Sequence, residues 1–372
     1  MDGPRRPRAR EIPDLGKMLY EVFRFDRMYS WEYFLAGLRR PAHRRGALII
    51  AADERPVSHI LTTYDHVSIY GCRIKVASIG GVSTHPDHRG KGYAGAILRH
   101  SLDRMTRAGA KLLIVSGNRT LYRRNHCARV GHLYEADLRP DLLPAPASSL
   151  SVRRVTRDDW PLLAPVHQTE PVRFLRTADS VSRGCFWWDC DNPEFWLIES
   201  KAGPLAYLGF TPVHDEEDGP TARRIFEYAG SRAAILDALP AIFQAAGLTR
   251  LRFRILGHDQ ELIYLLSRLN LQLTPATFYG THRLLDLPGL MRQLRPYLAA
   301  RLPRADLRRL SFQQEGETCT FAYGNEHLQL DLTKAVALVL GAPDAPKLSG
   351  DLHRLLSTIY PLPFPTPGFN YV

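Results

Sequence analysis

An internal repeat limits the fold of this chain more than any other feature of its sequence. The opening stretch PRAREIPDLGKMLYEVF and the later stretch VRRVTRDDWPLLAPVH share a spacing, since Asp14 and Leu19 recur as Asp158 and Leu163. Each stretch precedes two strand-like runs around a turn, ALIIAADERPVSHILTTY and FWLIESKAGPLAYLGF. Further on, AGAKLLIVSGN and AGLTRLRFRILGHD each place a Gly before a strand that ends in another Gly. Repetition on this scale predicts two copies of one α/β unit.

The end of the chain follows a different pattern from the repeat. The stretch PDLLPAPASSL at 140–150 has few side chains to bury and is typical of a linker. After Thr281, LLDLPGLMRQLRPYLAARL has helical spacing with Pro288 in the first turn, and LSFQQEGETCTFAYGNEHLQLDL alternates like antiparallel strands with turns at 315–317 and 324–325. The predicted fold class is therefore α/β, with two units that have mixed central sheets and a third, smaller α+β domain: 1–140, 151–281 and 282–372.

The net charge of +11 is confined to the first 150 residues. They hold 25 Lys and Arg against 14 Asp and Glu, whereas the rest of the chain holds 24 of each. A positive field of this kind attracts an anionic partner, which is either a nucleic acid or a polyphosphorylated small molecule. Composition alone does not choose between them.

A strand, a bare loop and a helix start follow one another between Lys75 and Met105. KVASIGGVST is strand-like, AGAILRHSLDRM is helical in composition, and HPDHRGKGYA is the loop that leads into the helix. The first amides of a helix have no intrahelical partner and lie at the positive end of its dipole. Gly90 and Gly92 remove side chains so that these amides can approach an anion. The loop is predicted to be a phosphate cradle, against the alternative of an ordinary helix-capping loop.

The spacing Arg-x-x-Gly-x-Ala in this loop resembles the acetyl-CoA loop of the GNAT superfamily of N-acyltransferases. A Walker loop would need Gly-Lys-Ser/Thr, and a dinucleotide fingerprint would need a third glycine and a later acidic residue. The resemblance implies tandem GNAT folds, acetyl-CoA as cosubstrate, and direct transfer of an acetyl group to a primary amine in a ternary complex. It assigns the binding of acetyl-CoA to the following residues: Val82, Ser83, Thr84, Arg89, Gly90, Lys91, Gly92, Tyr93, Ala94 and Asn118.

A second segment, LLIVSGNRTLYRRNHCARVGHLYEA, resembles the GNAT subgroup with a Gly-Asp-Pro-x-x-Tyr arrangement, with Gly117, Asn118 and Tyr122 at matching positions. The resemblance implies that Tyr122 faces the thioester sulfur and that the backbone N–H of Val82 faces the carbonyl. The alternative is that Tyr122 only packs its helix onto the sheet. The usual Gly-Phe pair is replaced by His126 and Cys127, which leaves the packing of the helix end open.

The second unit lacks the cradle, because the corresponding stretch reads FEYAGSRAAILDALP with a single glycine. It is expected to keep the fold without binding CoA. The whole layout resembles the enhanced-intracellular-survival type of acetyltransferase. That resemblance implies a sterol-carrier-protein-like fold for the third domain, in which HLQLDLTKAVALVLG is a strand and a helix that ends at Gly341.

The chain ends in an arm with prolines at 361, 363, 365 and 367, followed by aromatic and apolar residues. Burying such an end could offset the entropy lost on ordering it. In the enzymes that this chain resembles, the C-terminal carboxylate reaches the first active site. The resemblance implies that Val372 is a general base or an anchor for a cationic acceptor. The alternative is that the tail only seals the domain interface and a water chain removes the proton.

Several further features bear on partners and location. The predicted acceptor is a small-molecule or peptide amine, and a homo-oligomer is left open. No metal site is recognised, and the lack of a recognisable nucleic-acid module argues against a nucleic-acid partner. The rival function is a non-catalytic CoA-binding or basic nucleic-acid-binding protein. The absence of a long apolar run or signal peptide predicts a cytoplasmic protein with no membrane partner.

Two histidines, His85 and His88, are expected to be solvated or capping. A cluster of aromatic residues is expected to form core or an acceptor wall: Phe186, Trp187, Trp188, Phe195 and Trp196.

Overall fold

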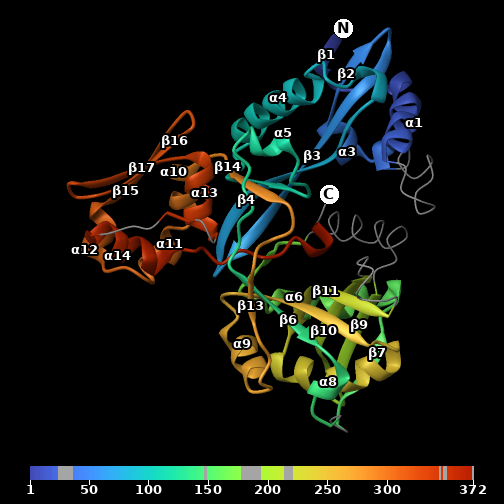
Figure 1. Cartoon of the computed structure of the whole chain (residues 1–372), viewed down its shortest axis with the longest axis vertical. Coiled ribbons are helices and arrows are strands. Elements are labelled where there is room, and N and C mark those ends of the chain that lie inside the picture. Colours follow the sequence, from blue (N-terminus) through green and yellow to red (C-terminus); the bar gives the residue numbers. More distant parts are fainter. Residues whose placement is uncertain are drawn as a thin grey trace.

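The computed structural model describes residues 1–23, 37–145, 149–176, 194–212, 221–342, 345–346 and 350–370. Figure 1 shows three bodies. The first unit lies at the top in blue and cyan, the second at the bottom in green and yellow, and the third at the left in orange and red.

The sheet of the first unit has one parallel pair of strands, β4–β5, and is otherwise antiparallel. A further strand, β8 (Val172–Phe174), pairs with the distal end of β3. The strands lie in the order β1 (Asp2–Arg5), β2 (Ala47–Ala52), β3 (Arg55–Ile69), β4 (Cys72–Thr84), β5 (Leu112–Val115) and β14 (Thr281–Leu284). The helices are α1 (Ile12–Phe23), α3 (Pro41–Gly46), α4 (Tyr93–Arg107) and the short α5 (Thr120–Arg123).

Helices cover both faces of this sheet. The apolar stripe of α4 packs on one face, where Ile97 and Leu98 join a core with Ile60 and Ile79. On the other face, α1 buries its own stripe against Ile49. The strands are strongly apolar because both of their faces are buried.

The sheet of the second unit repeats this plan, with β11–β12 as its parallel pair. Its helices are α6 (Trp160–Gln168), α8 (Arg232–Ala246) and α9 (Gln260–Ser267). The strand order is β13 (Thr274–Ala276), β6 (Leu133–Leu138), β12 (Arg250–Leu256), β11 (Ala222–Gly230), β10 (Gly203–Pro212), β9 (Glu194–Ser200) and β7 (Ser151–Arg154). The predicted fold class, two α/β units with mixed sheets, is confirmed.

The two units exchange a strand. Strand β6 precedes the linker but pairs with β12 in the second sheet, and β14 follows the second unit but pairs with β5 in the first. The division into 1–140, 151–281 and 282–372 stays a prediction, and the sheets do not follow it strand by strand. Alternating hydrophobicity identifies a strand but does not say which partner it will take.

The third body is a three-stranded antiparallel sheet with helices, and it packs against the first sheet through Val67 and Ile74. Its turns fall between 315 and 318 and between 323 and 326, as predicted, and Gly341 ends its helix α13. The likeness to a sterol carrier protein stays a prediction. The elements are α10 (Leu287–Gln293), α11 (Arg295–Ala299), α12 (Arg304–Arg309), β15 (Leu310–Glu315), β16 (Thr318–Tyr323), β17 (Glu326–Asp331), α13 (Leu332–Leu340) and α14 (Gly350–Ile359).

The C-terminal arm leaves the third body and crosses to the other two units (Figure 1). Phe364 is fully buried, and its ring lies edge-on to those of Phe278 and His282. Further along, Thr366 Oγ1 donates to the carbonyl of Phe226, and the arm ends its described part in a 3₁₀ turn, η6 (Gly368–Asn370). None of the described helices is long and apolar enough to cross a membrane.

Candidate active site

The parallel strands β4 and β5 part at one end. They pair only between Val76–Ile79 and Leu112–Val115, after which β5 ends and β4 continues to Thr84. Beyond Ile79, β4 also carries a bulge towards β3, because His59 lies opposite Ser83 while Leu61 lies opposite Gly80. Two residues, Gly81 and Val82, therefore face the single residue between them on β3.

The predicted cradle lies directly after this bulge. The 3₁₀ turn η2 (Pro86–His88) leads to Gly90 and Gly92, which have φ of +77° and +78°, values that favour glycine. A Cβ added at either glycine would meet no atom within 4 Å. The first bond of helix α4 is donated by Ala96 to Gly92, and no residue from 90 to 95 donates a backbone hydrogen bond to another described residue. These amides are open to an external acceptor at the positive end of a helix of four turns.

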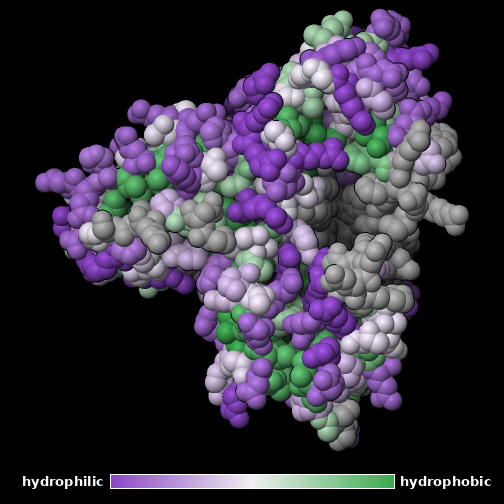
Figure 2. Space-filling view, in the orientation of Figure 1, coloured by the Kyte–Doolittle hydropathy of each residue, from purple (hydrophilic) through white to green (hydrophobic). Residues whose placement is uncertain are grey.

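Exposed cations lie on the cradle loop, on α4 and at α5. The guanidinium of Arg99 lies beside Gly95 in the first turn of α4, next to Leu121 of α5, so both helices contribute to one surface. Figure 2 shows hydrophilic side chains gathered over α4 and α5. Among the described residues, no Asp or Glu lies within 4 Å of the following exposed cations: Arg89, Lys91, Arg99, Arg119, Arg123 and Arg124. Only an anion from outside the described chain would balance them.

Tyr122 lies on α5, just past the end of β5. Its ring is buried against Gly117, where an added Cβ would be 2.9 Å from the ring. Burial raises the pKa of Tyr122 despite the nearby guanidinium of Arg119, so the phenol keeps its proton at neutral pH. In the part of the chain that the structure describes, its hydroxyl has no hydrogen-bond partner, although the ring packs as a core residue would.

The predicted cosubstrate residues lie together at the carboxyl ends of β4 and β5. Val82, Ser83 and Thr84 form the end of β4, and Asn118 follows β5. Arg89 links the loop to the strand, because its Nε donates to the carbonyl of Thr84 at 3.3 Å. The remaining residues form the loop and first turn of α4: Gly90, Lys91, Gly92, Tyr93 and Ala94. Val372 lies outside the described residues.

The pair that replaces Gly-Phe keeps the local turn. His126 has φ of +55°, the left-handed conformation that glycine would supply. Its ring binds the third body, with Nδ1 3.1 Å from Thr333 Oγ1 and Nε2 3.0 Å from Glu317. Cys127 is buried, and burial raises the pKa of its thiol to about 12. The sequence left this packing open, and contacts with the third body account for it.

The other residues singled out by the sequence have structural positions. His85 Nδ1 accepts from the amide of Asp87 and caps η2, as predicted. Phe195 and Trp196 are buried in the second unit, in agreement with a core role. The rest of that aromatic cluster, at 186–188, lies outside the described residues.

The helix start of the second unit is closed by its own side chains. Ser231 caps α8 by accepting from Ala234 N at 3.2 Å, and Gly230 N donates to Glu170 Oε1 at 2.8 Å. Arg232 binds Glu170 through two nitrogens, at 2.5 and 2.6 Å, and Asp259 at 2.9 Å. A carboxylate therefore stands where a helix terminus would otherwise attract an anion.

A tyrosine occupies the gap between β11 and β12. The hydroxyl of Tyr228 donates to Asp259 at 2.9 Å and accepts from the amide of Leu256 at 3.3 Å. It thereby joins the two parallel strands where they part. Sequence reasoning missed both features, the side chains that bind the start of α8 and the tyrosine between β11 and β12. Neither Tyr228 nor the arginine–carboxylate set belongs to a binding motif.

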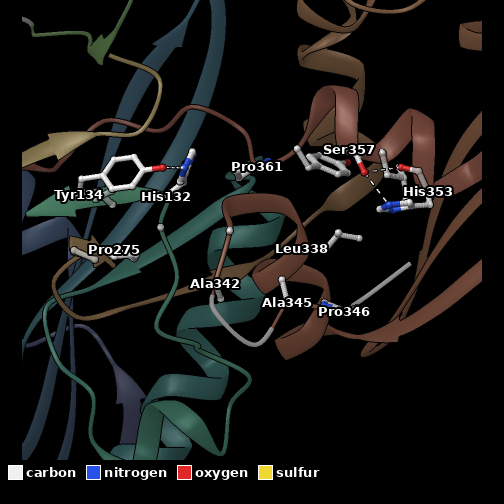
Figure 3. A pocket seen from close by; sticks show the side chains of 16 residues that line it. His132, Tyr134, Pro275, Leu338, Ala342, Ala345, Pro346, His353, Ser357 and Pro361 are labelled. Atoms are coloured by element: carbon white, nitrogen blue, oxygen red, sulfur yellow. Dashed lines mark hydrogen bonds between the residues drawn. The ribbon is translucent and has the colours of Figure 1, made fainter. Parts of the chain in front are cut away.

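An apolar cavity lies elsewhere (Figure 3). It has a volume of about 570 Å³ and lies between the strands β6 and β13 and the helices α13 and α14. His132 lies 3.3 Å from the Tyr134 hydroxyl on one side, and His353 lies 3.2 Å from Ser357 on the other. It includes none of the predicted site residues.

Residues 4–128 match the family described as the acetyltransferase (GNAT) domain. The first unit is a GNAT acetyltransferase domain. The chain is accordingly an acyltransferase, and the family to which this domain belongs generally uses acetyl-CoA. No curated protein matches the chain significantly.

Solved structures resemble the whole chain, beyond the GNAT domain alone. A GCN5-related N-acetyltransferase from Anabaena variabilis is 14% identical, with 95% of this chain and 96% of that one covered and a TM-score of 0.66. One from Kribbella flavida is 16% identical over 97% of both chains, with a TM-score of 0.65. Eis1 from Mycobacterium abscessus is 11% identical over 95% of both, with a TM-score of 0.63. At such identities the likeness shows the fold, which all three bodies share with these proteins.

Proposed function

We propose that this protein transfers the acetyl group of acetyl-CoA directly to a primary amine in a ternary complex. The observation that carries the proposal is the helix start at Gly92, where open amides lie on a loop with exposed cations that have no carboxylate partner among the described residues. A ligand that satisfies both must carry several negative charges in a compact group, as the phosphates of CoA do.

The residues fit this cosubstrate in order along the chain. The amides from Gly90 to Ala94, with Arg89 and Lys91, would hold phosphate. The end of β4 at 82–84 and Asn118 would line the path between the parted strands to Tyr122. When bound, acetyl-CoA supplies an activated acyl group as a thioester.

Two groups of the protein would act on the thioester. The N–H of Val82 would donate to the thioester oxygen as negative charge develops there during attack by the amine. Tyr122 would donate a hydrogen bond to the departing sulfur, which its raised pKa allows because the phenol stays protonated. The new C–N bond replaces the C–S bond, and the proton of the amine passes to a base.

For that base we propose the carboxylate of Val372. The arm is held up to Asn370, whose Oδ1 accepts from Arg176 Nε at 3.4 Å and which is itself buried. Because the arm is held two residues before Val372, its contacts support a fixed position for the C-terminal carboxylate. Adding one glycine after Val372, or deleting the last three residues, should lower kcat severely with little change in CoA affinity, whereas normal turnover in the extended protein would rule the base out.

The decisive experiment compares two glycines at opposite ends of α4. Gly92 and Gly109 have similar φ, +78° and +82°, and open space around the missing Cβ. Gly92→Glu should abolish CoA binding in calorimetry because it places a carboxylate among the phosphates, while Gly109→Glu should bind normally. Equal affinity of the two variants would contradict the proposal.

The acceptor should be a small-molecule or peptide amine. A panel of aminoglycosides, polyamines, amino acids and lysine peptides, followed by thiol release, would identify it. CoA binding without turnover on the panel would favour a non-catalytic CoA-binding protein. Nucleic-acid affinity that falls steeply with salt would favour the nucleic-acid alternative.

A further inference from the structure

A buried histidine holds the bulge of β4. His59 on β3 is 1% exposed, and its Nδ1 lies 2.8 Å from the carbonyl oxygen of Gly81. A carbonyl only accepts, so Nδ1 carries the proton. Burial lowers the pKa of His59 to about 4, which keeps the ring neutral near pH 7. Its buried Nε2 has no hydrogen-bond partner among the described residues, which is unfavourable.

The bond to His59 sets the direction of the next amide. Within a planar trans peptide, the carbonyl of Gly81 and the N–H of Val82 point in opposite directions. Because His59 draws the carbonyl towards β3, the N–H of Val82 turns away from β3. On that side β4 has no partner, since β5 stops pairing at Ile79.

We propose that His59 is a positioning residue, whose Nδ1–H holds the Gly81 carbonyl so that the N–H of Val82 faces the acyl oxygen. This inference rests on the proposed function, which assigns that N–H to the thioester. A bulge interrupts the ladder, so this peptide needs an anchor other than regular strand pairing. Gly81 also fits the ring, because φ is +57° and an added Cβ would lie 3.1 Å from the imidazole.

Two substitutions separate the hydrogen bond from the packing. Asn at 59 places its Nδ2 where His places Nδ1, and Leu fills space without a donor. His59→Leu should lower kcat about 10- to 100-fold, which is less than the loss of an oxyanion donor outright, with the Kd of CoA unchanged. His59→Asn should recover most of kcat.

A spectroscopic readout reports the amide itself. With carbonyl-¹³C acetyl-CoA bound, the infrared C=O stretch of the wild-type protein and of His59→Asn should lie at lower frequency than in His59→Leu. Thr63→Val is the matched control, because Thr63 lies four residues after His59 on the same face of β3 and its buried hydroxyl has no partner in the described part of the chain. It should change neither kcat nor the stretch.

The outcomes separate this inference from the proposed function. If the wild-type protein transfers acetyl groups, and a folded His59→Leu variant has the same kcat and the same C=O stretch, only the role of His59 is overturned. Absence of acetyl transfer and of CoA binding in the wild-type protein would overturn the proposed function. If His59→Leu does not fold, His59→Gln replaces it, because its amide reaches the place of Nε2. A lower kcat in His59→Gln than in His59→Asn supports the proposal, and equal kcat in the two variants overturns it.

Discussion

The two α/β units place the same elements around a parting pair of parallel strands but finish the site in opposite ways. In the first unit, α4 begins at an uncapped glycine with open amides. In the second, Ser231 caps α8 and Glu170 binds the terminus. The proposed anion site therefore lies at a helix end that the described chain leaves without a partner, and we expect none at α8, where side chains supply one.

The arginines show the same difference. In the second unit they face carboxylates, as in Arg153 with Asp159 at 2.9 Å and Arg254 with Glu135 at 2.8 Å. Around the cradle, the exposed cations have no such partners among the described residues. Part of the charge excess of the first 150 residues therefore lies on the exposed cations of the loop, α4 and α5.

The largest expected effect is on stability in the second unit. Glu227→Ala removes the carboxylate that buried Arg176 contacts at 2.6 Å, so the unfolding free energy should fall by about 3–5 kcal/mol. Arg123→Ala in the first unit should change it by less than about 0.5 kcal/mol. Urea unfolding measures both, and similar losses would break the comparison.

Tyr122 and Tyr228 distinguish a catalytic tyrosine from a structural one. Tyr122→Phe should lower kcat about 10- to 100-fold while melting is unchanged, since its hydroxyl has no partner in the described chain. Tyr228→Phe should cost about 1–3 kcal/mol of stability, because it leaves Asp259 and Leu256 N without its hydroxyl, with kcat unchanged. Steady-state kinetics measures kcat and calorimetry measures stability. A loss of stability in Tyr122→Phe together with a loss of kcat in Tyr228→Phe would contradict this assignment.

Buried histidine should make stability depend on pH. Burial, with Arg176 nearby, lowers the pKa of His167 from 6.5 to about 4. Between these values the unfolded chain binds a proton that the folded chain does not, so stability falls as pH falls from about 6.5 to 4. His167→Gln should reduce this slope by up to about 1.4 kcal/mol per pH unit. Exposed His327→Gln is the control, and an equal slope in both variants would contradict the assignment.

The smallest effect concerns single cations at the cradle. Arg119→Gln should weaken CoA binding about two- to fivefold, and less at high salt, as for an exposed ion pair. Arg250→Gln, which loses a pair with Asp137 in the second unit, should leave affinity unchanged. Titrations at two ionic strengths distinguish the variants, and a salt-independent loss would argue against a phosphate contact.

Local sequence signals predicted much of this molecule. Glycines at 90 and 92 identified the loop because positive φ leaves few other choices, and the turns near 315 and 324 followed from alternation and turn residues. The role of His59 was missed because a single histidine in an alternating strand resembles any core residue. The exchange of β6 and β14 was missed because it depends on pairing across long sequence separations.

That exchange has a consequence during synthesis on the ribosome. The first sheet lacks its last strand until residue 284 has been made, so the edge of β5 stays exposed while the whole second unit is translated. During the same period β6 has been synthesised but cannot pair with β12, which has not yet been made. The two units therefore mature together, and a cut in the linker would leave each with a missing or mismatched strand.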